Sequence, residues 1–412
     1  MSLIKPFAGL RPKPEFAADV VAPPYDVLNT EEARQRAAGR PYSFLHISKP
    51  EIDLPPGTDP YDASVYAKGA DNLQDLIDRG VLIRDSQPCY YLYRLIMGNH
   101  TQTGLVAIAS VADYDSNRIR KHEFTRPAKE DDRVRQIDAL NAQTGPVFLT
   151  YRHNAVIDDL AGRVASKASL YDLTADDGVR HTLWLIDDAS SIVTITKTFE
   201  DMDCLYIADG HHRSAAASRI AKMRRQATGR TAETAADYFL SVLFPDDQMK
   251  ILAYNRVVTD LKGLSESEFL TAVKQAFEVV ASEAAMKPTR PGEFGMYLAP
   301  QWYRLTILME RIPSNDPVGR LDVSLLQNNL IEPVLGIRDP RRDKRIDFVG
   351  GIRGLAELEK RVDSGEMQVA FSLYPTRMAD LMAVADANEV MPPKSTWFEP
   401  KLADGLVSHV LD

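Results

Sequence analysis

The chain has 412 residues, 44% of them hydrophobic and 26% charged, and its formal net charge at pH 7 is −9. This length predicts two or three domains of ordinary globular composition, and an acidic surface disfavours general binding to nucleic acid. Its two cysteines, Cys89 and Cys204, cannot by themselves form a disulfide framework or a structural zinc site. No segment approaches the roughly 18 apolar residues of a membrane span, and the N-terminus has no apolar signal region. We therefore expect a cytoplasmic protein with no membrane contact.

The segment 1–260 is predicted to form a core domain. Its predicted elements, in chain order, are a buried strand at 42–48, a helix at 62–79, hairpin strands at 89–97 and 101–114, a helix at 127–143, strands at 145–151, 181–187 and 204–209, and a helix at 213–227. Strands and helices alternate irregularly, which favours an α+β fold over a doubly wound sheet.

The segment 261–412 is predicted to form a second, C-terminal α+β domain. Its predicted elements are a helix at 265–280, strands at 292–299 and 301–309, a helix at 322–337, a strand at 367–375 and a helix at 377–388. The tail at 391–411 contains a Trp-Phe pair and is expected to dock on the body of the protein and to end in a short helix.

The stretch "YIADGHHRSAAA" joins a predicted strand to a predicted helix at Asp209, Gly210, His211, His212 and Arg213. The first amides of a helix lack internal partners, and the helix dipole favours anions there. A glycine permits a tight turn, histidines add donors, and an arginine offers a planar fork for phosphate. The pattern therefore predicts a phosphate-binding helix start. The alternatives are a capping acid, core histidines and a structural ion pair, or a metal site, for which no further ligand cluster has suitable spacing.

A second cluster of charge lies in "RIRKHEFTRPAKEDDRVRQ", where a helix is expected to start at Pro127. Its basic side chains suit a polyanion such as a nucleotide phosphate, and Glu123 or Asp132 suits a base or a magnesium ligand. The candidate ligand-binding residues here are Arg126, Lys129, Asp132 and Arg133. The alternative is a solvated helix with ion pairs, although same-sign neighbours such as Lys129 and Arg133 repel each other.

The D-G-H-H-R turn and its alanine-rich helix resemble the signature of the ParB/sulfiredoxin-like fold. Partition proteins of that class carry Gly-x-x-Arg, which contacts CTP phosphates, and sulfiredoxins carry Gly-Cys-His-Arg, which contacts ATP phosphates. Gly210 and Arg213 match both motifs, and His212 matches the sulfiredoxin histidine. His211 stands where the sulfiredoxin cysteine would be, which excludes that thiol chemistry. The resemblance implies ATP, ADP or CTP with magnesium as ligands.

A longer resemblance runs along the whole chain. The motifs "IKPFAGLRP", "APPYDVL", "KHEFTRPAKEDDR", "YIADGHHRSAAA", "LLQNNLIEPVLGI" and "MPPKSTWFEPKL" resemble the domain of unknown function 1015 family, some members of which are described as SpoOJ/ParA/ParB/RepB-like. Together the two resemblances imply a mixed sheet core of ParB/sulfiredoxin-like type with a second α/β region. Free-serine kinases share that fold, so phosphoryl transfer to or from serine is the implied chemistry.

The leading hypothesis is a small-molecule phosphotransferase or phosphohydrolase. In it the segment from His122 supplies catalytic groups: Glu123 is the base, His211 or His212 the acid or phosphate donor, and Asp209 orients a histidine or holds magnesium. Residues expected to close over the site are Asp26, Lys394, Ser395 and Thr396. The alternatives are a ParB-like DNA-binding regulator, which would need a basic face, and a ligand sensor without turnover. The oligomeric state stays open.

Overall fold

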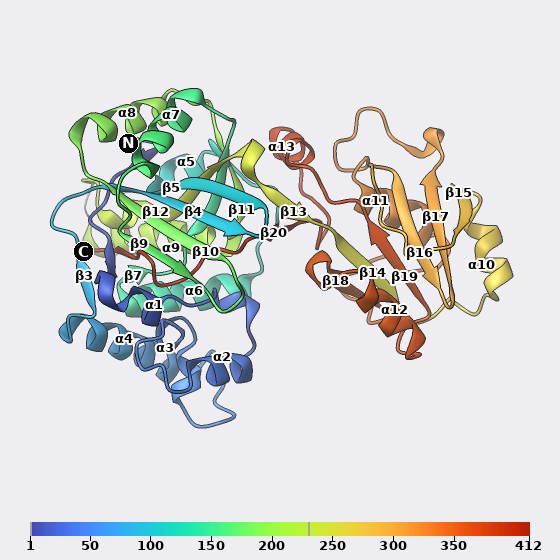
Figure 1. Ribbon diagram of the computed structural model, residues 1–412, viewed down its shortest axis with the longest axis horizontal. Helices are drawn as coiled ribbons and strands as arrows, with labels where there is room; N and C mark the ends of the chain where they lie inside the picture. Colours follow the sequence, from blue (N-terminus) through green and yellow to red (C-terminus); the bar gives the residue numbers. More distant parts are fainter. Residues whose placement is uncertain (1, 230) are drawn as a thin grey trace. The chain divides into compact units, whose positions relative to one another are not determined.

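The chain folds into two compact units in the computed structural model, which describes residues 2–229 and 231–412 (Figure 1). The first unit consists of Met1–Met249 with Pro400–Asp412, and the second of Lys250–Glu399. This division differs from the predicted one at residue 260. Strand β14 (Tyr254–Val258) pairs inside the sheet of the second unit, and the last segment of the chain returns to the first unit.

The first unit is built on a mixed sheet in the order β6-β11-β8-β12-β5-β4-β10-β9, with β1 paired to β5. Its strands are β1 (Ile4–Lys5), β4 (Tyr90–Met97), β5 (His100–Ser110), β6 (Ile119–Arg120), β8 (Val147–Tyr151), β9 (Tyr171–Thr174), β10 (Arg180–Ile186), β11 (Leu205–Asp209) and β12 (Tyr238–Pro245). The pairs β11–β6 and β12–β8 are parallel and the others antiparallel. The mixed α+β core is as predicted, and so is the hairpin of β4 and β5.

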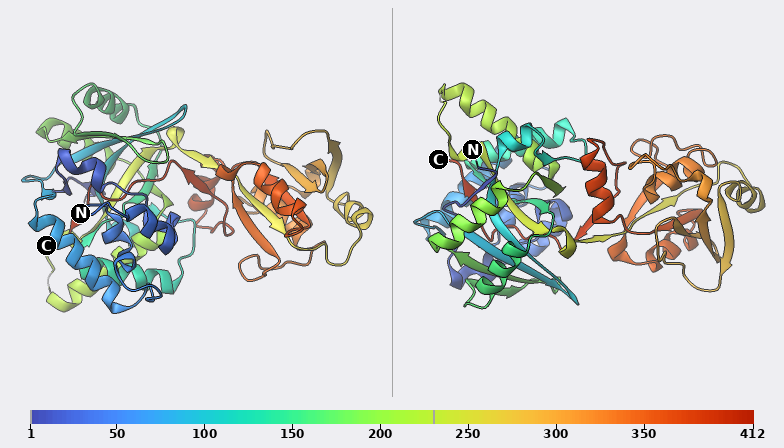
Figure 2. Two further views of the ribbon diagram at one scale, coloured as in Figure 1. Left: turned by 60° about the horizontal axis from the view of Figure 1, so that its bottom comes forward. Right: turned by 90° about the horizontal axis from the view of Figure 1, so that it is seen from above.

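Helices surround this sheet. They are α1 (Ala17–Val20), α2 (Thr30–Ala37), α3 (Leu45–Ser48), α4 (Ala63–Asp78), α5 (Val111–Asp115), α6 (Pro127–Leu140), α7 (Ala155–Ala165), α8 (Ala189–Glu200) and α9 (His211–Thr228), with 3₁₀ turns η1 (Pro14–Phe16), η2 (Tyr25–Val27), η3 (Pro50–Asp53), η4 (Ala235–Asp237) and η5 (Asp246–Gln248). Helices α7 and α8 lie on one side of the sheet, and α6 with α2, α3 and α4 on the other (Figures 1 and 2). Buried side chains of α7, α8 and α9 join those of the strands in one core.

The predicted strand at 42–48 is wrong, because this segment contains the short helix α3. Its apolar side chains, Phe44, Leu45 and Ile47, are fully buried. A short apolar run does not distinguish a buried strand from a buried helix, so the pattern was compatible with both.

The last residues of the chain thread through the first unit. Strand β21 (His409–Val410) pairs with β7 (Ala142–Gln143), Leu10 in β2 (Leu10–Pro12) forms a bridge with Ser408, and β2 pairs with β3 (Leu82–Arg84). The Leu411 side chain packs with residues of α6 and α9. The tail therefore docks, as predicted, but as extended backbone and not as a helix.

The second unit contains an antiparallel sheet in the order β15-β17-β16-β19-β14-β18. Besides β14, the strands of this sheet are β15 (Phe277–Ser282), β16 (Glu293–Leu298), β17 (Gln301–Ile307), β18 (Ile346–Gly350) and β19 (Val369–Leu373). Strands β13 (Lys250–Leu252) and β20 (Trp397–Glu399) pair with each other in a separate two-stranded sheet. Its helical segments are α10 (Glu266–Val273), α11 (Asp322–Leu326), α12 (Ala356–Asp363), α13 (Met378–Asp386), the 3₁₀ turns η6 (Met309–Arg311) and η8 (Gly351–Arg353), and the π-helical η7 (Gln327–Ile331).

The helix predicted at 265–280 is confirmed in its first half and wrong in its second. A capping box at Ser265 and Glu268 starts α10, but the helix ends at Val273 and the chain then forms strand β15, paired with β17. Residues of β15 such as Val279 and Val280 are β-branched and gain more from the ladder of β17 than from a longer helix.

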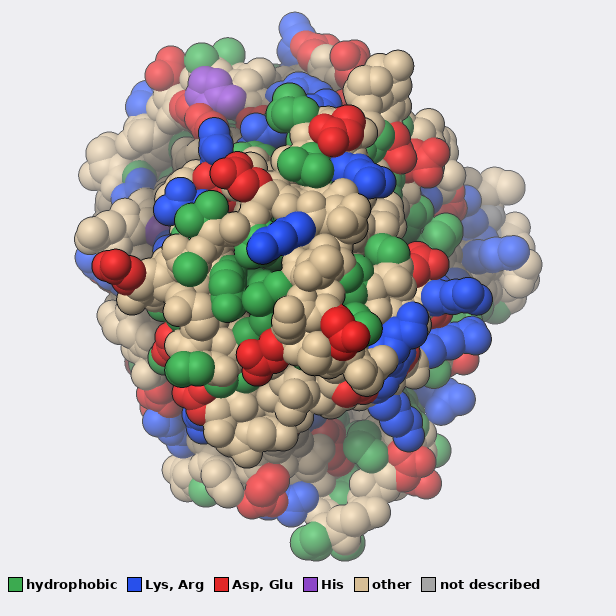
Figure 3. Space-filling view, turned by 90° about the vertical axis from the view of Figure 1, so that its right-hand side faces the viewer, with side chains coloured by type: hydrophobic (Ala, Val, Ile, Leu, Met, Phe, Trp, Pro, Cys, Tyr) green, Lys and Arg blue, Asp and Glu red, His purple; other side chains and the backbone are tan. Residues whose placement is uncertain are grey.

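The surface does not present one sign of charge on the face seen in Figure 3. Acidic and basic side chains are interspersed there, with Lys and Arg gathered along one edge. Among the described residues, no helix combines the length and the apolar character that a membrane crossing requires.

The turn at Gly405 packs the tail against Phe44 of the first unit, and a substitution there tests this contact. Gly405 has a φ of +87°, and a Cβ added there would lie 2.8 Å from Cγ of the Phe44 ring. Gly57 has nearly the same φ, +88°, with nothing within 4 Å. We expect Gly57→Ala to lower the free energy of unfolding by about 1–2 kcal/mol through backbone strain, and Gly405→Ala to lower it by ~1–3 kcal/mol more through overpacking. Urea unfolding of the full chain measures both, and equal losses would contradict the contact with Phe44.

Candidate functional site

The turn between β11 and α9 has the geometry of an anion-binding helix start. Gly210 precedes the helix with φ 97° and ψ 26°, in the left-handed region that favours glycine. The backbone N–H groups of Arg213 and Ser214 donate to its carbonyl at 2.9 and 3.1 Å. No acidic side chain stands in the first turn of α9. The positive end of the helix dipole is therefore not neutralised from within the helix.

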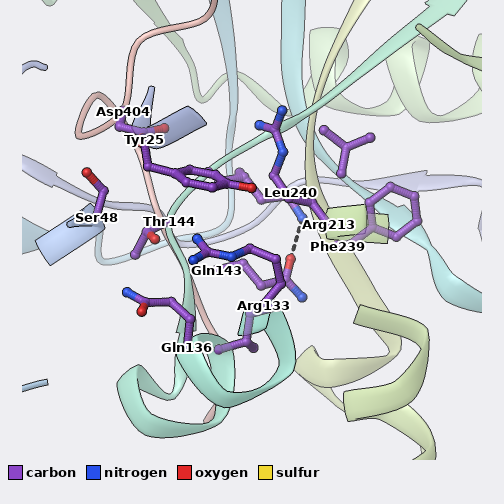
Figure 4. A pocket seen from close by; sticks show the side chains of 13 residues that line it. Tyr25, Ser48, Arg133, Gln136, Gln143, Thr144, Arg213, Phe239, Leu240 and Asp404 are labelled. Carbon is purple, nitrogen blue, oxygen red and sulfur yellow. Dashed lines mark hydrogen bonds between the residues drawn. The ribbon is translucent and has the colours of Figure 1, made fainter. Parts of the chain in front are cut away.

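Arg213 extends from this first turn into a small cavity (Figure 4). Its Nη1 donates to the Pro146 carbonyl, and no carboxylate of the described chain lies at ion-pair distance from its guanidinium. Burial opposes its charge, but the more distant charges of Asp26 and Asp209 outweigh that effect and raise the pKa of Arg213. A half-buried cation without a direct carboxylate partner is suited to hold an anion that the protein itself does not supply.

Helix α6 packs against α9 and brings Arg133 to the same cavity. The guanidinium of Arg133 is bound by Asp132, with Nη2 2.7 Å from Oδ2, and lies 4.0 Å from the centre of the Tyr25 ring. Asp132 also accepts a hydrogen bond of 2.9 Å from the Tyr66 hydroxyl. In Figure 4 the Tyr25 ring lies between Arg133 and Arg213. Of the two arginines, Arg133 is neutralised locally, so Arg213 is the one available to a ligand.

The two predicted motifs meet at their histidines. The rings of His122 and His211 are 4.5 Å apart, and the His122 backbone N–H donates to Nε2 of His211 at 3.4 Å. Nδ1 of His211 lies 3.7 Å from a carboxylate oxygen of Glu123. Burial lowers the pKa of His122 to about 4 and holds that of His211 well below its usual range. Both rings are therefore neutral at pH 7 and can donate hydrogen bonds but carry no charge.

A further contact joins the motifs at the surface. The backbone N–H of Arg126 donates to Nε2 of His212 at 3.0 Å, and burial lowers the pKa of His212. Lys129 donates to the hydroxyl of Tyr61 at 3.0 Å and is exposed. Acids of α6 pair with Arg219 of α9, including Asp131 at 2.8 Å. The exposed face of α6 thus carries the ion pairs expected of a solvated helix, while its inner face lines the cavity.

Two residues of the tail complete the site, and sequence reasoning missed both. Nζ of Lys401 lies 3.1 Å from Oδ2 of Asp209. Burial would raise the pKa of Asp209, but Lys401 and Arg213 outweigh it and hold the pKa well below its usual range. Asp404 is 2% exposed, and burial raises its pKa to about 7 although the charge of Arg213 opposes the shift. The lysine and the aspartate within the mostly apolar stretch "KLADGLV" were the available signal.

The other predicted residues are placed less directly. Asp26 is exposed beside the cavity, whereas its neighbour Tyr25, which was not predicted, lines it. The predicted closing residues of the tail, Lys394, Ser395 and Thr396, belong to the second unit, and their role stays a prediction. Among residues 2–229 and 231–412, no three His, Cys, Asp or Glu side chains gather into a metal-holding group.

The enclosed part of the cavity measures about 30 Å³. It is lined by side chains of η2, α6, α9 and the tail, and by the turn at Gly145 between β7 and β8. This is room for roughly two water molecules. It accommodates one small polar group and not a molecule of the size of a nucleotide.

Comparison with known proteins now gives the family. Residues 4–324 match the family described as "Protein of unknown function (DUF1015)". The chain belongs to this family. No curated protein matches this DUF1015 member.

Solved structures resemble the DUF1015 member only distantly. Free serine kinase in complex with AMP is 15% identical, with 73% of this chain and 92% of that chain covered and a TM-score of 0.34. A conserved hypothetical protein from Pyrococcus furiosus is 15% identical, with 73% and 95% covered and a TM-score of 0.33. SbnI with a C-terminal truncation, from Staphylococcus aureus, is 11% identical, with 73% and 85% covered and a TM-score of 0.36.

Asp404 predicts an unusual pH dependence of stability. Its pKa in the folded protein, about 7, lies above the value of roughly 3.9 in an unfolded chain, so the folded state binds the proton more tightly. The protonated Asp404 therefore stabilises the folded state fully below about pH 4, and this stabilisation is lost as the pH rises through 7. We expect Asp404→Asn to remove this loss, so that its advantage over the wild type grows between pH 4 and 8 by on the order of 2–4 kcal/mol. Urea unfolding across this range measures the difference, and parallel profiles for the two proteins would contradict a buried Asp404 with a raised pKa.

Proposed function

We propose that this protein is a phosphate-handling enzyme that binds a nucleotide or a phosphorylated small molecule at the start of α9. The observation that carries the proposal is Arg213, a cavity-lining guanidinium without a carboxylate partner, placed beside the glycine turn of that helix. Backbone amides, the helix dipole and a planar fork of donors together favour a phosphate there. The Gly-x-x-Arg spacing of Gly210 and Arg213 agrees with a ParB/sulfiredoxin-like core.

In this proposal the chemistry is phosphoryl transfer to or from serine. Such transfer depends mainly on positioning and on stabilising the charge of the transferred group. The phosphates of ATP, ADP or CTP would meet Arg213 and the amides of α9, with Arg126 and Lys129 at the rim. Magnesium would be held mostly by the phosphates, because Asp209 is already paired with Lys401.

Glu123 is the proposed base in this reaction. It is exposed and faces Nδ1 of His211, so it can reach both the solvent and the turn. The neutral rings of His211 and His212 would act as hydrogen-bond donors rather than as charged acids. Asp26 is proposed to close over the ligand, and the role of Lys394, Ser395 and Thr396 stays a prediction. The free cysteines, Cys89 and Cys204, fit a reducing cytoplasm.

Replacing Arg213 by alanine tests the phosphate site. We expect Arg213→Ala to weaken nucleotide binding by about 1.5–3 kcal/mol, or ten- to a hundredfold, because a charge-assisted contact is lost. The matched control is Arg219→Ala, which removes the same charge from the same helix at an exposed ion pair with Glu130 and Asp131. Isothermal titration with ATP, ADP and CTP, with and without magnesium, measures the affinities.

Equal effects of the two substitutions would mean that the response is general electrostatics and would overturn the placement at α9. Absence of heat with every nucleotide would leave a phosphorylated metabolite as the ligand, and the same pair of variants would then be compared with inorganic phosphate.

A further inference from the structure

The cavity beside Arg213 contains two buried polar atoms that lack a hydrogen-bond partner in the described chain. They are Oδ1 of Asp404 and Oγ of Ser48. Asp404 is 2% exposed and Ser48 5% exposed, and both line the cavity that Arg213 enters (Figure 4). An unsatisfied buried polar group is costly, and native proteins retain few of them. Two at one cavity indicate that a polar group normally occupies the space between them.

Gly145 keeps that space open. A Cβ built on Gly145 would lie 3.5 Å from Cδ of Arg213 and 3.6 Å from Oδ1 of Asp404. Any side chain at residue 145 would therefore stand between the guanidinium and the carboxylate. The guanidinium of Arg213 and the carboxylate of Asp404 line the same cavity without forming an ion pair. This arrangement is expected when a ligand binds to both of them.

The chemistry of the missing group follows from the atoms that face it. An ionised carboxylate only accepts hydrogen bonds, and a serine hydroxyl can accept as well as donate. Toward the ionised form of Asp404 the group must therefore be a hydrogen-bond donor, and a cationic donor best compensates the buried carboxylate charge. A primary ammonium meets both conditions, offers three donors and is close in size to the water molecules that the cavity admits.

We propose that the tail residue Asp404, together with Ser48, binds the ammonium group of an amino acid or its phosphate ester, while Arg213 holds the anionic group. This inference rests on the proposed function and deepens it, because it adds to the phosphate site a recognition end for an amino-acid substrate. It also makes the tail at 400–412 a part of the binding site.

The surroundings of Asp404 suit such a ligand. Burial raises its pKa to about 7, with the charges of Arg213 and Arg133 opposing the shift and that of Asp26 reinforcing it. An arriving ammonium favours the ionised form and lowers the pKa. Binding of an ammonium near pH 6.5 should therefore release a proton from Asp404, which binding of a plain anion at Arg213 would not do.

The test compares O-phospho-L-serine, L-serine and inorganic phosphate by isothermal titration of the full chain. We expect Asp404→Asn to weaken O-phospho-L-serine at least tenfold and inorganic phosphate less than twofold, and to abolish the extra proton release. Arg213→Ala should weaken both phosphate ligands. The matched control is Asp131→Asn, which removes the same charge from the exposed face of α6, where Asp131 pairs with Arg219, and should change both phosphate ligands less than twofold.

A second variant keeps the inference testable if Asp404→Asn does not fold. Gly145→Ala adds a methyl group at ordinary van der Waals distances, 3.5–3.7 Å, from Arg213 and Asp404. It should fold and should weaken O-phospho-L-serine more than inorganic phosphate.

Failure of the inference and of the proposed function can be told apart. If inorganic phosphate binds through Arg213 but O-phospho-L-serine gains nothing from Asp404, the ammonium site is overturned and the phosphate site stands. If L-serine binds in an Asp404-dependent way while no phosphate ligand depends on Arg213, the phosphate site is overturned and the ammonium site stands. If the wild type binds none of these three ligands and none of the nucleotides, both are overturned.

Discussion

The arrangement of the site depends on one electrostatic constraint, a half-buried Arg213 whose only close acceptor among the described residues is the Pro146 carbonyl. A cation withdrawn from water needs compensation, and here it comes from carboxylates at longer range. Asp209 already forms an ion pair with Lys401, and burial raises the pKa of Asp404 to about 7. The protein thus compensates the charge of Arg213 from a distance, with no carboxylate of the described chain bound to its guanidinium.

The returning tail gives this constraint its geometry. After the second unit the chain re-enters the first, where Lys401 reaches the β11–α9 turn and Asp404 reaches the cavity. Leu411 then packs with Val134 of α6 and Ala216 of α9. The tail therefore supplies charge to the site and also apolar contact to the two helices that form it. Loss of tail docking would disturb the ligand site and the core beneath it together.

Membership of the DUF1015 family identifies the lineage of the chain but no activity, so function has to be argued from the site. Two segments about ninety residues apart in sequence meet there through contacts such as Arg126 to His212, separated by 86 positions. Their histidines are neutral because they are buried against each other. This favours a role in orienting a ligand by hydrogen bonds over a role as a charged acid.

Local chemistry in the sequence determined the elements that carry the site. Gly210 before an alanine-rich helix, Pro127 at a helix start and the alternating strands of the hairpin each specify their own backbone, because caps, turns and periodicity act over a few residues. Only the tertiary structure decided which polar side chains meet. Tyr25, Lys401 and Asp404 enter the site through bridges such as Ala22 to Asp404, and no local pattern encodes a pairing across hundreds of residues. The helix α3 and the strand β15 were likewise decided by burial and by a partner strand, which a short apolar segment cannot specify alone.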